Sequence, residues 1–428
     1  MDKSTQITKK IFRKDETTKV RQRIMGIVFL AIGIFIFSVL SQTLLPEAET
    51  VFVMSPGGSL VKTPDLIFNS QLVIIILAVL CAGLGIYQFI KGFGKYTNLV
   101  LVFVGLMLTI SFLAWGASGG SINVGGMLRI MIMRSIPIVL GALSGILCER
   151  AGVVNIAIEG MMISGALVGA IVGSLFGLWA GALAAIVVGG LVAFVHAILS
   201  IKYKVDQIIS GTIINIFTIG LTSYIVTKIL QEREWQYLNQ SGIFMPTGIP
   251  ILSKIPFIGP ILFNHNPYVY SMYILVIILS IALFRTKWGL RVRSVGEHPK
   301  AADTLGINVF RIRYTSVILG GMLAGFAGSY FSLGSAGYFN QDMTAGRGFI
   351  GLAAMIFGNW TPIGSLGAGL LFGFAESLAT NLTLLRVPIP SDLMLNVPYI
   401  LTMVVLAGVV GRSRGPAAAG TPYEKESL

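Results

Sequence analysis

The polar residues that could do chemistry in this chain are few, and two of them lie close together. Asn155 and Glu159 are four residues apart in the apolar stretch Val153–Gly173, a spacing that places both side chains on one face of a helix. A carboxylate beside an amide can hydrogen-bond a polar solute, or it can hold an opposing helix. Glu376, with Asn381 five residues later, is a second such place. Both uses remain open for each carboxylate.

The sequence lacks the signatures of soluble catalytic sites. The phosphate-binding pattern G-x-x-x-x-G-K-[ST] fails because Tyr96 follows Gly94 and Lys95. Neither G-x-S-x-G nor H-E-x-x-H occurs. With three histidines and two cysteines there is little material for a metal site. We therefore expect no catalytic residue, no metal ion and no cofactor in this chain, and an intramembrane enzyme is the least favoured function.

Composition indicates the elements that must position these residues. Hydrophobic types make up 54% of the 428 residues and charged types only 11%, whereas a soluble protein carries roughly 25% charged residues. The predicted fold class is all-α, a polytopic transmembrane helical bundle of about 10–12 spans in membrane lipid. The net charge of +13 is not arranged as a basic stripe interleaved with aromatic residues, so nucleic acid is excluded as a partner.

A span needs roughly 20 mostly apolar residues, and twelve stretches are candidates. They are Ile24–Leu45, Leu72–Ile90, Leu99–Ala117, Met127–Leu147, Val153–Gly173, Gly177–Leu199, Ile208–Leu230, Pro267–Phe284, Thr315–Gly334, Met343–Gly358, Ile363–Leu385 and Leu393–Val410. Met127–Leu147 carries Arg129 and Arg134, and the short Met343–Gly358 includes Arg347. Either of these two could be a half-membrane helix surrounded by protein.

Lysine and arginine predict the orientation. With both termini in the cytosol, the inside segments hold 23 of the 31 basic residues, as the positive-inside rule requires. The predicted organisation is a basic cytosolic arm (1–23), N-terminal spans (24–117), a core (118–411) with a cytosolic loop (285–313), and a cytosolic tail (412–428).

Glycines recur at every fourth position of the fifth and sixth candidate spans. This spacing clears one helix face, so that a neighbouring backbone can approach closely. A conduit lining or a hinge is the alternative use. The residues are Gly165, Gly169, Gly173, Gly177 and Gly181.

The cytosolic loop contains a short helical signal. Pro299 can begin a helix, and Gly306 can end it. The pattern predicts a helix of about two turns that exposes Ala301 and Ala302, whose small side chains would fit a partner's groove. A solvated connector is the alternative.

Two segments resemble the nucleoside-type permease subunits of bacterial ABC importers, within the family that also serves ribose and branched-chain amino acids. The first is Cys148–Met162, which reads C-E-R-A-G-V-V-N-I-A-I-E-G-M-M. The second, Gly289–Arg313, resembles the family's coupling loop, and the resemblance extends from Met127 to Gly411. It implies that the loop contacts an ATPase through residues Gly296, Glu297, Pro299, Ala301, Ala302, Asp303 and Gly306.

The resemblance also implies the partners. Two permease subunits, often different proteins, would pair in the cytoplasmic membrane above two ATPase subunits that bind ATP and magnesium. A substrate-binding lipoprotein outside would deliver nucleosides, and Asn155, Glu159, Asn359 and Glu376 are the residues that we expect along the solute pathway. A simple sugar such as ribose remains an alternative solute. A secondary transporter driven by an ion gradient, with Glu159 as its coupling carboxylate, remains an alternative mechanism.

Overall fold

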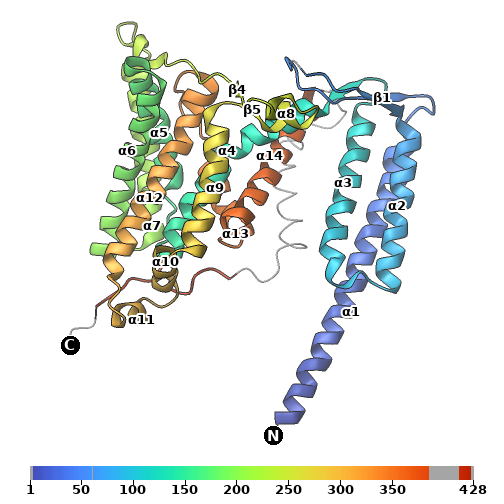
Figure 1. The fold of residues 1–428 in the computed structure, drawn as a ribbon, viewed down its shortest axis with the longest axis horizontal. Helices are drawn as coiled ribbons and strands as arrows, with labels where there is room; N and C mark the ends of the chain where they lie inside the picture. The colour runs from blue at the N-terminus through green and yellow to red at the C-terminus, as the bar shows by residue number, and fades with distance from the viewer. Residues whose placement is uncertain (1–2, 60, 385–413, 426–428) are drawn as a thin grey trace. The chain divides into compact units, whose positions relative to one another are not determined.

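The computed structural model describes residues 3–59, 61–384 and 414–425, and it is mainly helical (Figure 1). Ten helices in these ranges are long and apolar enough to cross a membrane. The predicted polytopic helical bundle is therefore confirmed, although the all-α prediction did not include two short sheets. The contacts divide the chain into two compact units, Met1–Gly126 with Thr380–Met394, and Met127–Ala379 with Leu395–Leu428.

The first unit contains three long helices and a small sheet. The helices are α1 (Lys3–Phe35), α2 (Ser70–Ile90) and α3 (Thr97–Gly116), and the strands are β1 (Glu49–Val53), β2 (Leu66–Asn69) and β3 (Ser121–Asn123). Strand β1 lies in the middle, antiparallel to β2 and parallel to β3. Because α1 begins at Lys3, the predicted basic arm and the first span form one continuous helix.

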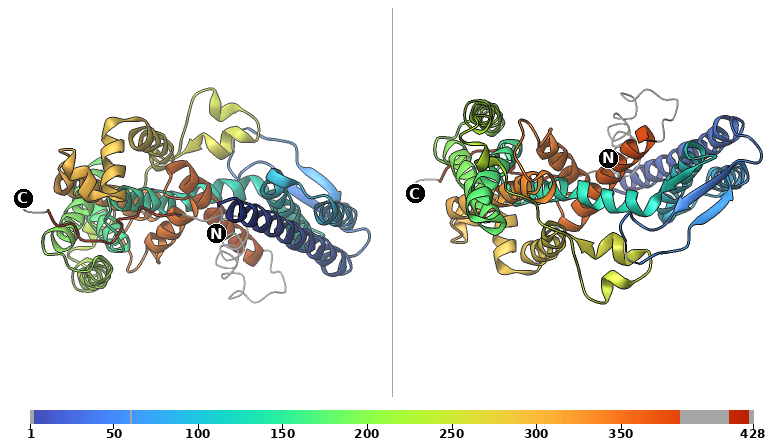
Figure 2. Two further views of the ribbon diagram at one scale, coloured as in Figure 1. Left: turned by 90° about the horizontal axis from the view of Figure 1, so that it is seen from below. Right: turned by 90° about the horizontal axis from the view of Figure 1, so that it is seen from above.

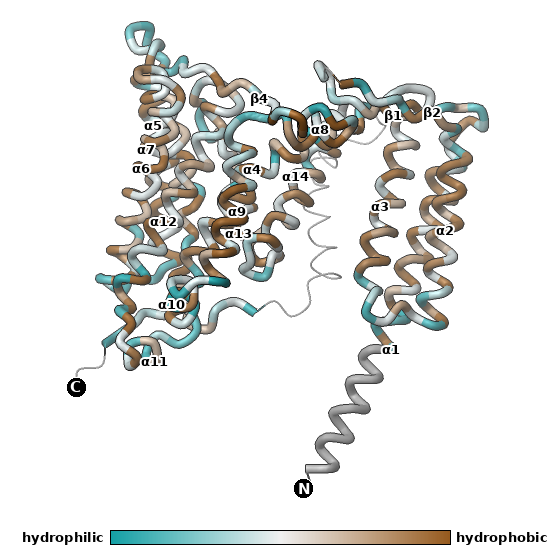
Figure 3. Tube along the Cα trace, viewed as in Figure 1, coloured by the Kyte–Doolittle hydropathy of each residue, from teal (hydrophilic) through white to brown (hydrophobic). Residues whose placement is uncertain are grey.

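The second unit contains the remaining elements. Its helices are α4 (Val124–Arg150), α5 (Ile158–Phe176), α6 (Leu178–Ala197), α7 (Gln207–Ile225), α8 (Ile258–Leu262), α9 (Pro267–Arg285), α10 (Lys287–Glu297), α11 (Pro299–Thr304), α12 (Val309–Ser329), α13 (Arg347–Phe357) and α14 (Pro362–Leu384). Strands β4 (Thr247–Gly248) and β5 (Asn264–His265) form a two-stranded antiparallel ribbon. Hydrophobic residues predominate along the long helices, and hydrophilic segments lie mainly at the helix ends and in the connections (Figure 3).

Helices α5, α6 and α12 pack against one another at close range, and they lie together in the end-on views (Figure 2). A Cβ atom on Gly165 would lie 2.3 Å from the carbonyl oxygen of Gly325, and one on Gly181 would lie 2.6 Å from that of Gly169. Gly173 has a similar approach, 2.8 Å from Leu333 Cδ2. Gly177, with φ +89°, instead forms the turn between α5 and α6. Gly165 and Gly181 therefore let the backbones of α5, α6 and α12 approach one another closely.

The structure distinguishes the two predicted spans for which a half-membrane helix was the alternative. The stretch Met343–Gly358 contains the 11-residue helix α13, which is about 16 Å long at 1.5 Å per residue. That is about half of the roughly 30 Å hydrocarbon core. Of the two alternatives for this stretch, a full span or a half-membrane helix, the structure shows the half-length helix. By contrast, Met127–Leu147 lies within the full-length α4. The predicted span Leu393–Val410 lies outside the described residues.

Candidate functional site

An irregular segment separates α12 from the half-length helix α13. A π-helical segment, Tyr330–Ala336, continues α12, and the chain then runs through residues 337–346 before α13 begins at Arg347. Non-helical backbone at membrane depth is tolerated only where protein or water satisfies its polar groups. The start of α13 therefore needs hydrogen-bond acceptors from elsewhere in the bundle.

The Glu159 carboxylate supplies these acceptors. Its Oε1 accepts from Thr344 Oγ1 at 2.6 Å and from the Gly346 backbone N–H at 2.8 Å, and Oε2 accepts from the Gly348 N–H at 2.6 Å. The side chain is buried, with 2% of its surface exposed. A carboxylate at a helix N-terminus satisfies unpaired N–H groups and is stabilised by the helix dipole. Glu159 therefore joins the first turn of α5 to the start of α13.

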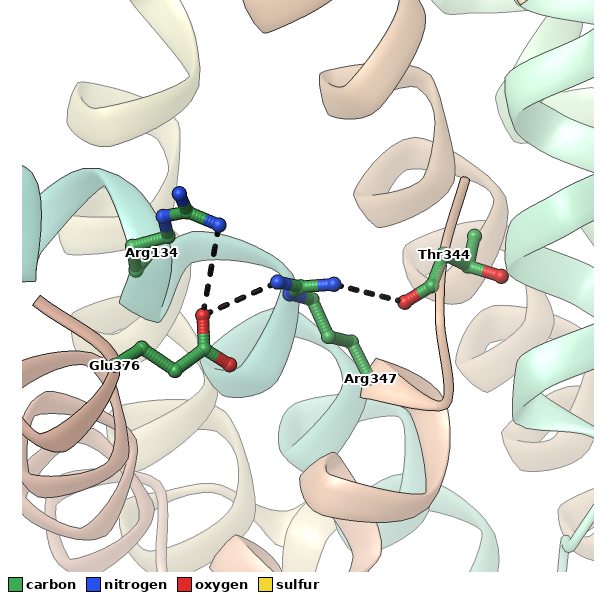
Figure 4. Close-up of polar contacts among 4 residues, drawn as sticks. All are labelled: Arg134, Thr344, Arg347 and Glu376. Atoms are coloured by element: carbon green, nitrogen blue, oxygen red, sulfur yellow. Dashed lines mark hydrogen bonds and ion pairs between the residues drawn. The ribbon is translucent and has the colours of Figure 1, made fainter. Parts of the chain in front are cut away.

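A cluster of three charged side chains lies beside this junction (Figure 4). Glu376 Oε2, from α14, is 3.2 Å from Arg347 Nη2 and 3.8 Å from Arg134 Nη1 of α4. The same Arg347 guanidinium donates to the Thr344 carbonyl oxygen at 3.3 Å and lies over the Phe331 ring. The cluster therefore ties α4, α13 and α14 together, and it continues from the Glu159 contacts through Thr344.

Among the residues that the structure describes, two guanidinium groups share the Glu376 carboxylate, so the charges of these three side chains are unequal. The side chains of Glu376 and Arg347 are 17% and 16% exposed, and that of Arg134 is 44% exposed. Ionisable groups within membrane spans are costly and usually mark solute pathways or ion pairs. A partly accessible polar site is therefore present within an otherwise apolar bundle.

The structure does not place Asn155 on one helical face with Glu159, and that prediction was wrong. Helix α5 begins only at Ile158, and Asn155 lies in the preceding non-helical segment. Gly152, with φ +86°, helps to end α4 in a turn before this segment. Asn155 is fully buried, and its Oδ1 accepts from the Ala157 N–H at 3.0 Å. Its geometry is that of a residue that stabilises a buried turn.

Asn359 lies apart from the charged cluster. It occupies the turn between α13 and α14, at the end of the unit where Arg150 donates to the Trp360 carbonyl oxygen at 3.1 and 3.0 Å. Glu376 is 14 residues beyond the start of α14, which corresponds to about 21 Å along a helix. The four residues expected along the pathway are therefore not brought together, although Glu159 and Glu376 are linked through residues 344–348.

A helical hairpin at the end of the second unit contains the residues expected to contact an ATPase. Helices α10 and α11 meet at His298, whose Nδ1 accepts from the Ala301 N–H at 3.1 Å. Gly306, with φ +78°, follows α11, and its N–H donates to the Asp303 carbonyl oxygen at 2.8 Å. The short helix thus begins at Pro299, and the left-handed glycine lies just beyond its end.

The two alanines of α11 differ in exposure. Ala301 is exposed as predicted, but Ala302 is buried, with 2% of its surface exposed. Ala302 packs with Val295 and Val309. The two alanines differ because neighbouring positions on a helix point to different sides. The prediction that both alanines are exposed was therefore wrong for Ala302. On the outer side of the hairpin, Leu305 is 82% exposed.

The hairpin is closely seated on the bundle. A Cβ atom on Gly296 would lie 2.2 Å from the carbonyl oxygen of Arg150, so α10 meets the end of α4 by direct backbone contact. Glu297, at the end of α10, accepts from the Ala417 N–H at 3.3 Å. The hairpin therefore has an inner face fixed against the bundle and an outer face on which Ala301 and Leu305 are exposed.

Comparison with known proteins identifies the family. Residues 127–410 match the family described as branched-chain amino acid transport system / permease component. The chain belongs to this family of permeases. The resemblance seen in the sequence from Met127 onward is confirmed, and the match begins where the second unit begins.

Individual relatives are ABC transporter permeases. The permease is 41% identical over 304 residues to the guanosine ABC transporter permease protein NupQ of Bacillus subtilis, covering 69% of this chain and 95% of the relative. It is 37% identical to the nucleoside ABC transporter permease protein NupC of Lactococcus lactis, with the same two coverages. A putative glucose ABC transporter permease protein, TsgC13 of Haloferax volcanii, is 32% identical over 70% of this chain and 98% of its own length. No solved structure matches the permease.

The permease is thus a multi-pass membrane protein and a transport component rather than an enzyme, and it acts with ABC partner subunits. Sequence reasoning noted Arg134 and Arg347 only as charges that weaken two candidate spans. The available signal was that an ionisable residue within a span needs a partner, and Glu376 is one of the few carboxylates within the candidate spans. The contacts of residues 414–425 were missed, because only a tail was predicted there.

Proposed function

We propose that this chain is one of two permease subunits of an ATP-driven importer that brings nucleosides across a bacterial cytoplasmic membrane. In this proposal, both termini and the hairpin α10–α11 lie in the cytosol. Two ATPase subunits, which bind ATP and magnesium, dock there. A substrate-binding lipoprotein outside delivers the nucleoside, and a second, different permease forms the other half of the pathway.

The nucleoside assignment is supported by similarity to the guanosine and nucleoside permeases over 95% of their lengths. The putative glucose permease is less similar, at 32% identity. This observation carries the proposal. A sugar is the competing solute, and it offers hydroxyl groups but no base edge.

Within the bundle, we assign the solute pathway to the partly exposed cluster of Arg134, Arg347 and Glu376. Guanidinium and carboxylate groups can hydrogen-bond ribose hydroxyls and base edges. Glu159 acts behind this cluster, because it holds the start of α13 from which Arg347 projects. Low affinity at the cluster is sufficient if the lipoprotein selects the solute.

Coupling follows from the order of the elements. Helix α11 is joined to α12 by only four residues, 305–308, and α12 is packed closely against α5 and α6. A displacement of α11 by the ATPase would therefore be transmitted to three helices as one body. Rigid movement of packed elements about an interface is a common form of conformational switch.

The solute assignment is tested by uptake in cells that lack other nucleoside transporters and express the complete importer. We expect labelled guanosine to accumulate, and an excess of unlabelled nucleoside to abolish the signal, whereas excess ribose or glucose leaves it unchanged. Accumulation of labelled glucose but not of guanosine would replace the nucleoside with a sugar.

The orientation is tested by labelling of single cysteines. Leu305→Cys lies beside α11, and Met245→Cys lies in the loop before β4; the two native side chains are 82% and 70% exposed. The native Cys81 and Cys148 are buried and give little background. We expect a membrane-impermeant maleimide to label Met245→Cys in intact spheroplasts and Leu305→Cys only in inverted vesicles. The opposite pattern would place α11 outside and overturn ATPase docking.

A further inference from the structure

The C-terminal segment Arg414–Lys425, here called the strap, lies within the predicted tail (412–428). It runs along the end of the second unit next to α10 and α11 (Figure 1). The Ala418 N–H donates to the Gly296 carbonyl oxygen at 2.9 Å, and Arg313 Nη1 donates to the Thr421 carbonyl oxygen at 3.0 Å. The strap is therefore bonded both to the end of α10 and to the first turns of α12.

Tyr423 fixes the strap from within. Its side chain is buried in a cluster with Val295, Ala302 and Val309, which come from α10, α11 and α12. Its ring also contacts the Phe310 ring, with 5.3 Å between the centroids. The buried side of α11 thus rests on a cluster to which the strap contributes the aromatic ring of Tyr423.

An ion pair holds the end of the strap. Glu424 binds Lys204, which lies in the connection between α6 and α7. The hydrogen bond from Lys204 lowers the pKa of the Glu424 carboxyl below its ordinary value. Exposed pairs of this kind are individually weak. This one adds to the bonds at Ala418 and Thr421.

A groove of about 870 Å³ lies between α11 and the strap. Its lining includes Ala301 and Thr304 of α11, Asn308 and Phe310 at the start of α12, and Tyr423 and Lys425 of the strap. Charged side chains on both sides, including Asp303 and Glu424, disfavour lipid chains as the occupant. The groove is continuous with the exposed face of α11, so whatever docks on α11 also meets the strap.

We propose that α11 and the strap form one composite docking surface for the ATPase subunit. The strap supplies the second side of the groove and holds α11 against the bundle, so that the motion of the ATPase reaches α12. This inference rests on the proposed function, and it extends the docking surface beyond the coupling loop to residues 414–425.

The test measures how much ATPase co-purifies with the full-length permease in detergent, at equal permease abundance. Glu424→Lys places a second cation beside Lys204 and should lower the retained ATPase by about fivefold. The charge-swapped double variant, Lys204→Glu with Glu424→Lys, should restore retention. Tyr423→Ala, which removes the buried ring, should lower it as well. The matched control is Glu232→Lys, the same charge change at an exposed position in the loop after α7, which should retain the wild-type level.

The outcomes separate this inference from the proposed function. If Ala301→Arg on α11 releases the ATPase while Glu424→Lys and Tyr423→Ala retain it at the wild-type level, the strap has no part in docking and the proposed function stands. If the unaltered permease retains no ATPase, the proposed function itself fails. If Tyr423→Ala lowers permease abundance, that variant cannot test docking. The test then rests on Glu424→Lys and on the double variant with Lys204→Glu, because these substitutions change only surface charges.

Discussion

Two carboxylates inside the second unit, Glu159 and Glu376, have different kinds of partner. Glu159 accepts from one hydroxyl and two backbone N–H groups, with almost no exposed surface. Glu376 pairs with two guanidinium groups that remain partly exposed. The first environment is that of a group that stabilises a break in the helical backbone, and the second is that of a partly exposed ion pair.

Replacing Glu376 with Gln leaves Arg134 and Arg347 without their shared anion. We expect guanosine uptake to fall by about tenfold or more at equal membrane abundance, the effect of roughly 1.4 kcal/mol on the transport step. Glu376→Asp keeps the charge and should lose less. Normal uptake by Glu376→Gln would show that these ion pairs serve only to pack helices.

Both carboxylate oxygens of Glu159 accept hydrogen bonds. Replacing Glu159 with Gln puts an NH₂ group, which cannot accept, in the place of one of these oxygens. The loss should lower the free energy of unfolding by about 1–3 kcal/mol, the usual cost of an unsatisfied buried polar group. A lower melting temperature of the purified permease is the expected result, with Glu232→Gln in the exposed loop as the control. An unchanged melting temperature together with an altered solute affinity would instead assign Glu159 to solute binding.

At the scale of elements, the glycine contacts make a graded prediction. A Cβ atom on Gly325 of α12 would lie 2.1 Å from the Ala185 carbonyl oxygen, whereas one on Gly220 of α7 would meet nothing within 4 Å. Gly325→Ala should therefore destabilise the permease by about 1–3 kcal/mol. Gly220→Ala should be neutral, or stabilising by about 0.5–1 kcal/mol, because alanine suits a helix interior better. Equal melting temperatures for the two variants would contradict the close packing of α5, α6 and α12.

The alanines of α11 make a second prediction at this scale. Ala301→Arg adds a large side chain to the exposed face, so it should reduce ATPase co-purification without changing the melting temperature. Ala302→Leu adds volume inside the cluster with Val295 and Val309, so it should lower the melting temperature by overpacking. If both variants behave alike, α11 does not present one buried and one free face.

The sequence predicts well those elements that local patterns specify. Hydropathy located most of the spans, and Pro299 and Gly306 marked the short helix α11 because proline and glycine act on the local backbone. The break before Ile158 could not be predicted in this way. The apolar pattern continues from Val153, and the break depends on distant side chains, such as Gln207, whose Oε1 accepts from the Val154 N–H at 2.6 Å.

The candidate site shows the same limit. Glu159, Glu376 and the coupling loop were found from residue type and position. The partners of Glu376 come from 242 and 29 residues away in the chain, at Arg134 and Arg347. The place of Ala302 depends partly on Tyr423, which packs beside it from the end of the chain. Such contacts follow from tertiary packing, which no local pattern encodes.

At the scale of the whole molecule, the permease family accounts for the second unit, and Met1–Gly126 lies outside the family match. The second unit holds both features that transport requires in this account, the charged cluster within the bundle and the hairpin at its end. Helix α12 connects them, since it follows α11 and packs with α5, which bears Glu159. The account therefore predicts that the driving force enters at α11 and comes from ATP.

The most direct test is guanosine accumulation by proteoliposomes that contain both permeases, both ATPases and the binding lipoprotein. With no ion gradient, we predict accumulation only when magnesium and ATP are present on the side where α11 lies, and its loss in the Ala301→Arg variant. Accumulation that follows an imposed proton or sodium gradient and ignores ATP would contradict the account, and it would assign the permease to secondary transport.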